Sequence, residues 1–148
     1  MILSLALGLG IFVLTLCVQA VPTALLIRIT TSTHSRGLLR PAFWPNFVLF
    51  QVAVLLLALA QLVNVALWAL LYCVCGEFAE FETAFYHSAV NFSSLGYGDI
   101  VMSARWRLLG PLEAMNGIVM FSLSTALMFT LLARLIQRRL KAKGEANG

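Results

Sequence analysis

The sequence predicts an all-α membrane protein with three transmembrane helices and a shorter helix that re-enters the membrane between the second and the third. Three observations predict this class. The chain of 148 residues is 61% hydrophobic and only 11% charged, which is more apolar than a single soluble domain. Three apolar runs each exceed the roughly 20 residues that a helix needs to cross a hydrocarbon core of about 30 Å. A polar, glycine-rich stretch separates the last two runs.

The three apolar runs are the predicted transmembrane helices. Backbone amides find no water in the membrane core, so each run should form a helix that satisfies them internally. Polar side chains inside a run usually face other helices, and aromatic side chains near run ends often meet the interface. The runs cover residues 1–28, 46–75 and about 108–136; the polar residues singled out within the second run are Gln51, Gln61 and Asn64, and the tryptophans are Trp44, Trp68 and Trp106.

Basic residues predict how these helices are oriented, because lysine and arginine in short segments mark the cytoplasmic side. One group lies just before and within a predicted loop at residues 29–45. A second group lies just before and within a predicted tail at residues 140–148. We therefore expect a multi-pass protein of the plasma membrane, with the N-terminus and residues 76–107 outside and the C-terminus in the cytoplasm. The groups are Arg28, Arg36 and Arg40, then Arg134, Arg138, Arg139, Lys141 and Lys143.

The first run has a second interpretation, a cleaved signal peptide. Its residues 18–20, Val-Gln-Ala, resemble the small-residue cleavage pattern. Against this, no basic residue precedes the apolar stretch, which is also longer than is usual in signal peptides. Cleavage would leave the first basic group outside and invert every later helix. We expect a retained helix.

The stretch FETAFYHSAVNF, at about residues 81–92, predicts a short helix that dips into the membrane from outside. It contains no helix breaker, is too short to cross and is too apolar for an exposed loop. Acidic residues near its start are favoured by about 0.3–1 kcal/mol each, and its partially negative C-terminal end would favour a cation in the membrane centre. Non-helical backbone at that depth is tolerated only where it lines a water-filled path or is buried in protein.

The segment that follows, Ser94-Leu95-Gly96-Tyr97-Gly98-Asp99, resembles the selectivity-filter signature of potassium channels. That family usually has threonine followed by valine or isoleucine before the first glycine, where this chain has Ser94 and Leu95. The order of helix, short helix, filter and helix also resembles the family's two-helix pore module. The resemblance makes residues 46–139 a pore domain, with an outer helix at 46–75, a pore helix at about 81–92, a filter at 94–99 and an inner helix at about 108–136.

The resemblance implies a potassium-selective channel that conducts K⁺ passively through a homotetramer in the lipid bilayer. Carbonyl oxygens of Ser94, Leu95, Gly96 and Tyr97 would replace the hydration shell of K⁺. Gly96 and Gly98 would adopt the left-handed backbone conformations that this requires. Tyr97 would pack behind the filter, and Asp99 would attract cations at the outer mouth. Beyond the permeant K⁺, no cofactor is expected, and no nucleic acid.

Residues of the third run are candidates for gating and for the cavity below the filter. Gly117 matches a position where the family often has a hinge glycine, although close packing of helices also favours a small residue. Helical spacing puts Phe121, Thr125 and Phe129 on the same face. Phe129 could form a hydrophobic constriction, or it could simply face lipid or pack.

Three further residues are candidates for supporting the pore. Glu113 is the one acidic residue inside a run, and a carboxyl at membrane depth usually has a function and a partner. It could bond to Asn116 or to a pore-helix hydroxyl such as Ser88 or Ser93. His87 occupies a position where the family often has an aromatic residue that bonds to the filter tyrosine; it could do the same for Tyr97, or respond to external pH.

Other classes are disfavoured. No run carries regularly spaced arginines, so a voltage sensor is not predicted, and no catalytic constellation appears, so an enzyme is not expected. The remaining alternative is a non-conducting membrane subunit that assembles with another channel or transporter. The thiols of Cys17, Cys73 and Cys75 should be free.

Overall fold

The computed structural model describes residues 1–35 and 43–145, and these residues form four helices without a strand. The helices are α1 (Ile2–Ser35), α2 (Phe43–Val74), α3 (Phe81–Phe92) and α4 (Leu109–Glu145). Three of them are long and apolar enough to cross a membrane, over Ile2–Ile29, Trp44–Val74 and Leu109–Gln137. The predicted all-α class with three long apolar helices is therefore confirmed.

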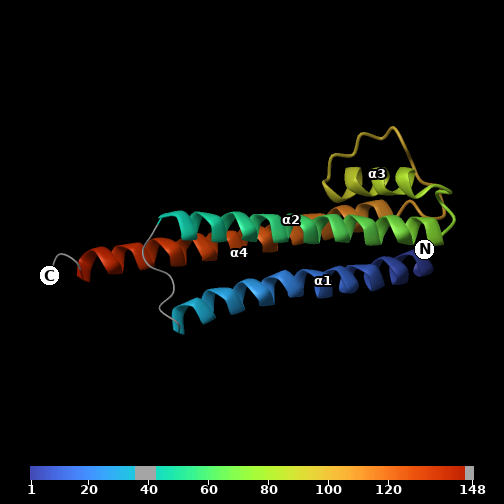
Figure 1. Cartoon of the computed structure of the whole chain (residues 1–148). Helices are drawn as coiled ribbons and strands as arrows, with labels where there is room; N and C mark the ends of the chain where they lie inside the picture. The colour runs from blue at the N-terminus through green and yellow to red at the C-terminus, as the bar shows by residue number, and fades with distance from the viewer. Residues whose placement is uncertain (36–42, 146–148) are drawn as a thin grey trace.

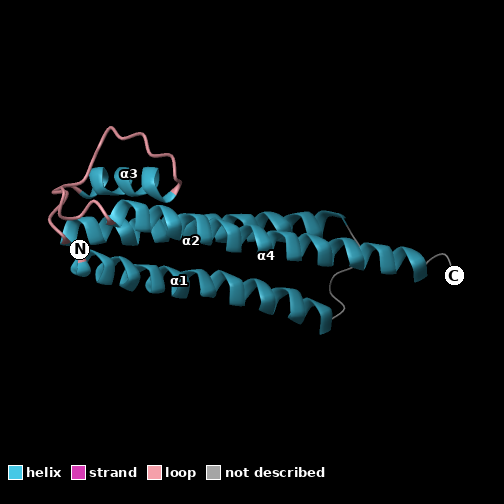
Figure 2. Cartoon of the chain, turned by 180° about the vertical axis from the view of Figure 1, so that it is seen from behind, coloured by secondary structure: helices cyan, strands magenta, loops and turns pink. Residues whose placement is uncertain are grey.

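The three long helices run alongside one another, and α3 lies beside one end of this bundle, next to α2 (Figure 1). The N-terminus of the chain lies at the same end as α3, and α1 diverges from α2 and α4 toward its own C-terminal end (Figure 2). Helix α3 contacts both α2 and α4, and α1 contacts both as well. The short helix and the loop after it are thus supported by two of the long helices.

Helix α3 begins and ends where its sequence and capping bonds dictate. Glu80 precedes it in an extended conformation, and the Ala84 amide donates to the Glu80 carbonyl at 3.1 Å. At the other end, the Ser93 amide and hydroxyl both donate to the Ala89 carbonyl, at 3.1 and 2.7 Å. These bonds satisfy a carbonyl that helix termination would leave unpaired.

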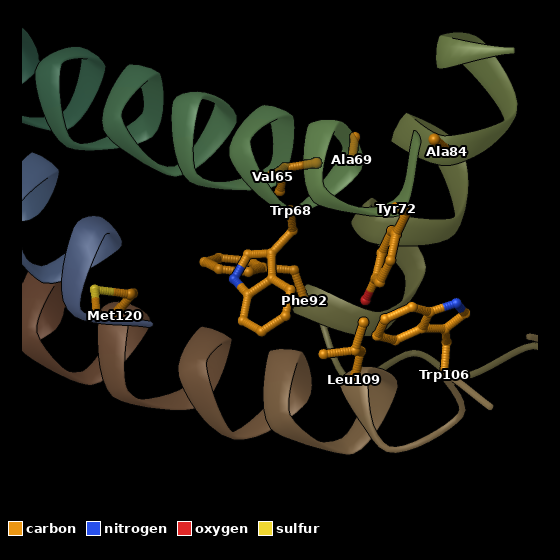
Figure 3. Packing of buried hydrophobic residues seen from close by; sticks show 9 residues of the cluster. All are labelled: Val65, Trp68, Ala69, Tyr72, Ala84, Phe92, Trp106, Leu109 and Met120. Carbon is orange, nitrogen blue, oxygen red and sulfur yellow. The ribbon is translucent and has the colours of Figure 1, made fainter. Parts of the chain in front are cut away.

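A core beside α3 joins α2, α3, α4 and the segment before α4. Figure 3 shows Trp68 and Tyr72 projecting from α2 toward α4. Trp68 is completely buried and Trp106 is 7% exposed, so both pack inside the protein, whereas Trp44 is 72% exposed. The core consists of Val65, Trp68, Ala69, Tyr72, Ala84, Phe92, Trp106, Leu109 and Met120. A second apolar cluster of Leu26, Ala53, Leu57, Leu131 and Leu135 joins the long helices toward their other end.

Two helices extend beyond the ranges expected from hydropathy. Helix α1 continues to Ser35 and α4 to Glu145, because a helix need not end where its apolar residues end. Residues such as Leu140 and Lys141 are good helix formers and continue α4 past the apolar run. Arg36 and Arg40 of the predicted basic loop lie outside the described residues, as do residues 146–148 of the predicted tail.

Candidate ion pathway

The chain after α3 stays attached to the last turn of that helix. The amides of Leu95 and Gly96 both donate to the Val90 carbonyl, at 3.0 and 3.3 Å, and the Ser94 amide donates to the Asn91 carbonyl at 2.8 Å. The non-helical segment therefore starts in a defined position at the C-terminal, partially negative end of α3.

Backbone conformations of opposite hand alternate along this segment. Ser94, Gly96 and Gly98 have φ of 59°, 58° and 73°, in the left-handed region, and Leu95 and Tyr97 between them do not. Ser94 is the only non-glycine residue with a positive φ in the part of the chain that the structure describes, and this conformation costs an L-residue about 1–2 kcal/mol. The left-handed residues recur at every second position. This alternation is what the backbone needs if successive carbonyls are to point to the same side.

Side chains of the same segment find few partners within the chain. Leu95 is 54% exposed and Tyr97 is 67% exposed. The packing expected for Tyr97 behind the filter is therefore not formed within this single chain. Behind the segment lies an open concavity of about 540 Å³, whose lining includes His87, Asn91, Gly96, Gly98 and Gly110.

Asp99 is held by a residue that the sequence analysis did not single out. The Tyr86 hydroxyl of α3 donates to Asp99 Oδ2 at 2.7 Å. This hydrogen bond holds the pKa of the Asp99 carboxyl below its usual range, and it raises the pKa of Tyr86. Both groups are exposed in the single chain, and Asp99 remains a carboxylate with negative charge at the edge of the segment. The sequence did not predict that Tyr86 binds Asp99, because the two residues are 13 positions apart and no local pattern relates them.

His87 lies inside the protein, beneath the segment. It is 5% exposed, and its Nε2 lies 2.9 Å from Asn91 Nδ2. Its ring packs against Phe78 and Tyr72, with ring centroids at 5.0 and 5.5 Å. Burial lowers the pKa of the His87 imidazole, which favours the neutral ring. The hydrogen bond expected from His87 to Tyr97 is replaced in the single chain by the contact with Asn91.

Glu113 is completely buried where α2, α3 and α4 meet. The Tyr72 hydroxyl of α2 bonds to one carboxyl oxygen and the Ser88 hydroxyl of α3 bonds to the other. Ser88 Oγ also lies 2.8 Å from the Val65 carbonyl of α2. Ser88 was among the partners expected for Glu113, but Tyr72 was missed because nothing in the sequence relates it to a residue 41 positions away.

Two other expected partners of Glu113 bond elsewhere. Asn116 bonds to Thr15 of α1 and Trp68 of α2, and the Ser93 hydroxyl bonds to carbonyls within α3. Glu113 and Asn116 are three residues apart on α4, so their side chains lie on adjacent but not identical directions of the helix. They therefore meet different partners.

Gly117 is the point at which α3 rests on α4. A Cβ atom added to Gly117 would lie 1.9 Å from the Phe92 carbonyl oxygen, far inside van der Waals contact. One turn later, the Phe121 ring packs edge-on against Phe92 with ring centroids 5.6 Å apart. Thr125 and Phe129 of the same predicted face are exposed, Phe129 at 73%. Close packing against Phe92 therefore explains why residue 117 is small. The part of the same helix face that carries Thr125 and Phe129 is not covered within the single chain.

A protein-family model described as ion channel matches residues 48–134 of this chain. The chain belongs to this ion channel family. The match contains nearly all of α2, all of α3 and its loop, and α4 as far as Arg134. It confirms, at the level of the family, the resemblance to the two-helix pore module. No curated protein and no solved structure matched the chain in the corresponding comparisons.

Membership of the ion channel family, together with three apolar helices, makes this a multi-pass membrane protein. The family is one of channels rather than of enzymes. Within the described residues, no group of three or more histidine, cysteine, aspartate or glutamate side chains could hold a metal ion, and all three cysteines are free thiols.

The channel has one more polar contact near the candidate filter that the sequence analysis missed. Both carboxylate oxygens of Glu77, after α2, accept from Ser103, one from its amide and one from its hydroxyl, the latter at 2.8 Å. This contact ties the turn before α3 to the segment after the candidate filter. The candidate filter segment therefore starts from a defined position on α3, and the chain four residues beyond Asp99 is held at Ser103.

Proposed function

We propose that this channel is selective for potassium and conducts it passively through a pore formed by four copies of the chain. The observation that carries the proposal is the alternation of backbone hand at Ser94, Gly96 and Gly98, in a segment attached to the C-terminal end of α3. Family membership supplies the general function, and this geometry supports the choice of ion.

The chemistry of dehydration supports potassium. An ion leaves water only where oxygens replace its shell, and rings of backbone carbonyls do this for K⁺ in channels. Ser94, Leu95, Gly96 and Tyr97 would each contribute a carbonyl, and the Ser94 hydroxyl would complete the inner end. Gly98 would continue the alternation to Asp99. The negative end of the α3 dipole and the Asp99 carboxylate both raise the local concentration of cations.

Four copies are proposed because one chain forms only one wall of a pore. The exposed side chains of Leu95 and Tyr97, and the open concavity behind the segment, leave room for contacts with another copy. Closed cyclic symmetry places the same wall at each position around an axis. In such an assembly Tyr97 would be buried between copies, and Phe121, Thr125 and Phe129 would line the cavity below the filter.

The remaining candidate residues are proposed to support the pore. Glu113 braces α3 through Ser88 and α2 through Tyr72, and His87 fills the space beneath the filter beside Asn91. Asn116 and Gly117 position α4, and bending at Gly117 is the proposed movement of gating. We also propose the plasma membrane as the location, with the N-terminus outside and the basic C-terminal end in the cytoplasm.

Purified protein in liposomes tests the proposal. Potassium flux that barium blocks, with potassium and rubidium passing well ahead of sodium in bi-ionic recordings, is the expected result. Equal sodium and potassium permeability would overturn the proposed selectivity. Absence of any flux would overturn conduction by this chain alone and favour a non-conducting subunit.

A matched pair of variants links the flux to the filter. Gly96→Ala should abolish conduction, because alanine would have to adopt φ near 58° at a cost of about 1–2 kcal/mol in each copy. Space is not the obstacle, since a Cβ at Gly96 would meet no atom within 4 Å. Gly10→Ala in α1, where a Cβ also meets nothing, is the control and should conduct like the parent. A conducting Gly96→Ala variant would show that position 96 does not need glycine, as Ser94 adopts a similar φ without it.

A further inference from the structure

One face of α1 carries small and polar side chains in an otherwise apolar helix. Ser4, Gly8, Thr15 and Gln19 are all buried, and their spacing of four, seven and four residues places them on one side of the helix. Polar groups at membrane depth are stabilised by partners on other helices. Helix α1 lies outside the residues that match the ion channel family, so its role is not accounted for by the two-helix module.

Thr15 makes the first polar contact between α1 and α4. The Asn116 Nδ2 group donates to Thr15 Oγ1 at 2.9 Å, and Thr15 Oγ1 donates to the Phe12 carbonyl of its own helix at 2.7 Å. The Trp68 Nε1 group of α2 donates to Asn116 Oδ1 at 3.1 Å. Thr15, Asn116 and Trp68 are all completely buried, so this contact joins three helices without water.

Gln19 makes the second contact, one turn further along α1. Its Nε2 group donates to Ser124 Oγ of α4 at 3.0 Å. Gln61 of α2 donates to the same oxygen at 2.8 Å, and its Nε2 group also lies 3.3 Å from Gln19 Oε1. Gln19 is 2% exposed, and its partners Gln61 and Ser124 are partly buried.

The two contacts lie on opposite sides of Gly117. Asn116 immediately precedes this glycine, and Ser124 follows it by about two turns, roughly 10 Å along the helix axis. On α1, Thr15 and Gln19 are one turn apart in an unbroken helical stretch without glycine or proline. A bend of α4 at Gly117 would move Ser124 relative to Asn116, and one rigid turn of α1 could not keep both bonds.

We propose that Thr15 and Gln19 are positioning residues through which α1 clamps α4 on both sides of Gly117 and holds the channel in its closed conformation. In the structure α4 is one unbroken helix from Leu109 to Glu145, which is the conformation that the two contacts fit. The link to gating rests on the proposed function, whereas the restraint on α4 does not. Weakening either contact should therefore favour the conformation in which α4 bends.

Two substitutions, one at each contact, test the clamp. Thr15→Val removes the acceptor of Asn116, and Gln19→Leu removes the donor to Ser124. Thr23→Val is the matched control for the first, because the Thr23 hydroxyl donates to the Gln19 carbonyl of its own helix at 2.8 Å. Gln51→Leu, at an exposed position on α2, is the control for the second. Thr15→Ser keeps the hydroxyl and should behave like the parent.

The first readout is single-channel recording in planar bilayers. Open probability, measured as the ratio of open to closed times, should rise by about threefold or more in Thr15→Val and Gln19→Leu, since one membrane hydrogen bond is worth about that factor. Unitary conductance should stay unchanged, because the filter is intact. Misfolding would reduce the number of channels but not alter the gating of those that remain. An open probability that stays the same or falls in both variants overturns the closed-state assignment.

The second readout does not depend on conduction. Hydrogen exchange of residues 118–130, measured by mass spectrometry in lipid nanodiscs, should be faster in Thr15→Val and Gln19→Leu than in the two controls. If the parent conducts no ions but this exchange differs as expected, the proposed function fails and the restraint on α4 stands. If the variants exchange like their controls, α1 does not clamp α4 and the proposal is wrong.

Discussion

Asp99 ends the candidate filter and Glu113 lies on α4 in contact with α3, and their surroundings suit these two carboxyl groups to different tasks. Asp99 is exposed and accepts a hydrogen bond from Tyr86, so it can present its charge to ions at the mouth. Glu113 is completely buried and meets hydroxyl groups from two helices. A buried polar group without partners is costly, so these hydroxyls explain how a carboxyl can stand inside an apolar helix.

Tyr86→Phe should make potassium current more sensitive to external acid. The Tyr86 hydroxyl lowers the pKa of Asp99, so in the parent the carboxylate stays charged to a lower pH. Without that hydroxyl the pKa of Asp99 rises toward its ordinary value, so the carboxylate is protonated at a less acidic pH. As the external solution is acidified, the current of the variant should therefore fall earlier than the current of the parent. Recording the pH of half-maximal current checks this. In an Asp99→Asn background, Tyr86→Phe should not shift the pH of half-maximal current. A shift in that background would show that the effect of Tyr86 does not act through Asp99.

Glu113→Ala should weaken the assembly, whereas Glu113→Gln should be tolerated. Alanine leaves the buried hydroxyls of Tyr72 and Ser88 without the carboxyl, at about 1–3 kcal/mol per subunit. Glutamine keeps the shape and retains polar atoms for both hydroxyls. Thermal dissociation of the purified oligomer in detergent measures the difference, and open probability measures whether the filter remains conductive. An alanine variant equal to the parent in both measurements would remove the bracing role of Glu113.

At the scale of secondary structure, α3 is positioned by its close approach to α4 at Gly117, by the bond from Ser88 to Glu113 and by the aromatic core beneath it. The last turn of α3 brings the Phe92 carbonyl against the Cα atom of Gly117, and Phe121 packs on the Phe92 ring. Since the candidate filter begins two residues after Phe92, any displacement of this turn moves the filter directly. The contact therefore couples the position of α4 to the start of the candidate filter.

Gly117→Ala should displace the last turn of α3 and reduce conduction. The added methyl group would lie 1.9 Å from the Phe92 carbonyl oxygen, which is backbone and cannot rotate away. Overpacking of this kind costs about 1–3 kcal/mol in each subunit. Potassium flux in liposomes and the thermal stability of the oligomer should both fall. Gly10→Ala, a helical glycine with open space around it, is the control. Normal flux in Gly117→Ala would show that α3 has room to shift.

At the scale of the whole molecule, the long helices are joined by polar contacts in a bundle whose outer surface is apolar. Besides the contacts of Thr15 and Gln19, Ser4 donates to the Arg105 carbonyl at 3.1 Å, which ties the start of α1 to the segment before α4. These bonds make the first run an integral helix of the fold. Retention of this helix stays a prediction; cleavage after residue 20 would leave Asn116 and Ser124 without these partners.

The proposed orientation predicts which positions an impermeant thiol reagent can reach in intact cells. In a background without Cys17, Cys73 and Cys75, a cysteine at Glu80 should be labelled from outside. A cysteine at Ser35 should be labelled only after the membrane is made permeable, because the positive-inside rule places the neighbouring arginines in the cytoplasm. Labelling of the Ser35 position in intact cells would reverse the orientation.

Sequence alone determined the class of this protein and the place of its candidate filter. Hydropathy is enough for the three long helices, because a membrane-spanning helix needs only length and apolar side chains. Residues 94–99 stood out because glycine at alternate positions is a local requirement of the backbone, and the structure has left-handed conformations at Ser94, Gly96 and Gly98. Ser88 was an expected partner of Glu113 because both lay near the same end of adjacent helices.

Only the tertiary structure decided which side chains meet. Tyr72 on Glu113, Tyr86 on Asp99 and Glu77 on Ser103 each join residues 13 to 41 positions apart. Such pairs depend on how each helix is rotated about its axis and how helices cross, which hydropathy does not encode. Trp68 is buried for the same reason, since it faces α4 and donates to Asn116 there. Thr15 and Gln19 of α1 were not singled out from the sequence, because a hydrogen bond to Asn116 or Ser124 can be identified only when both helices are in place.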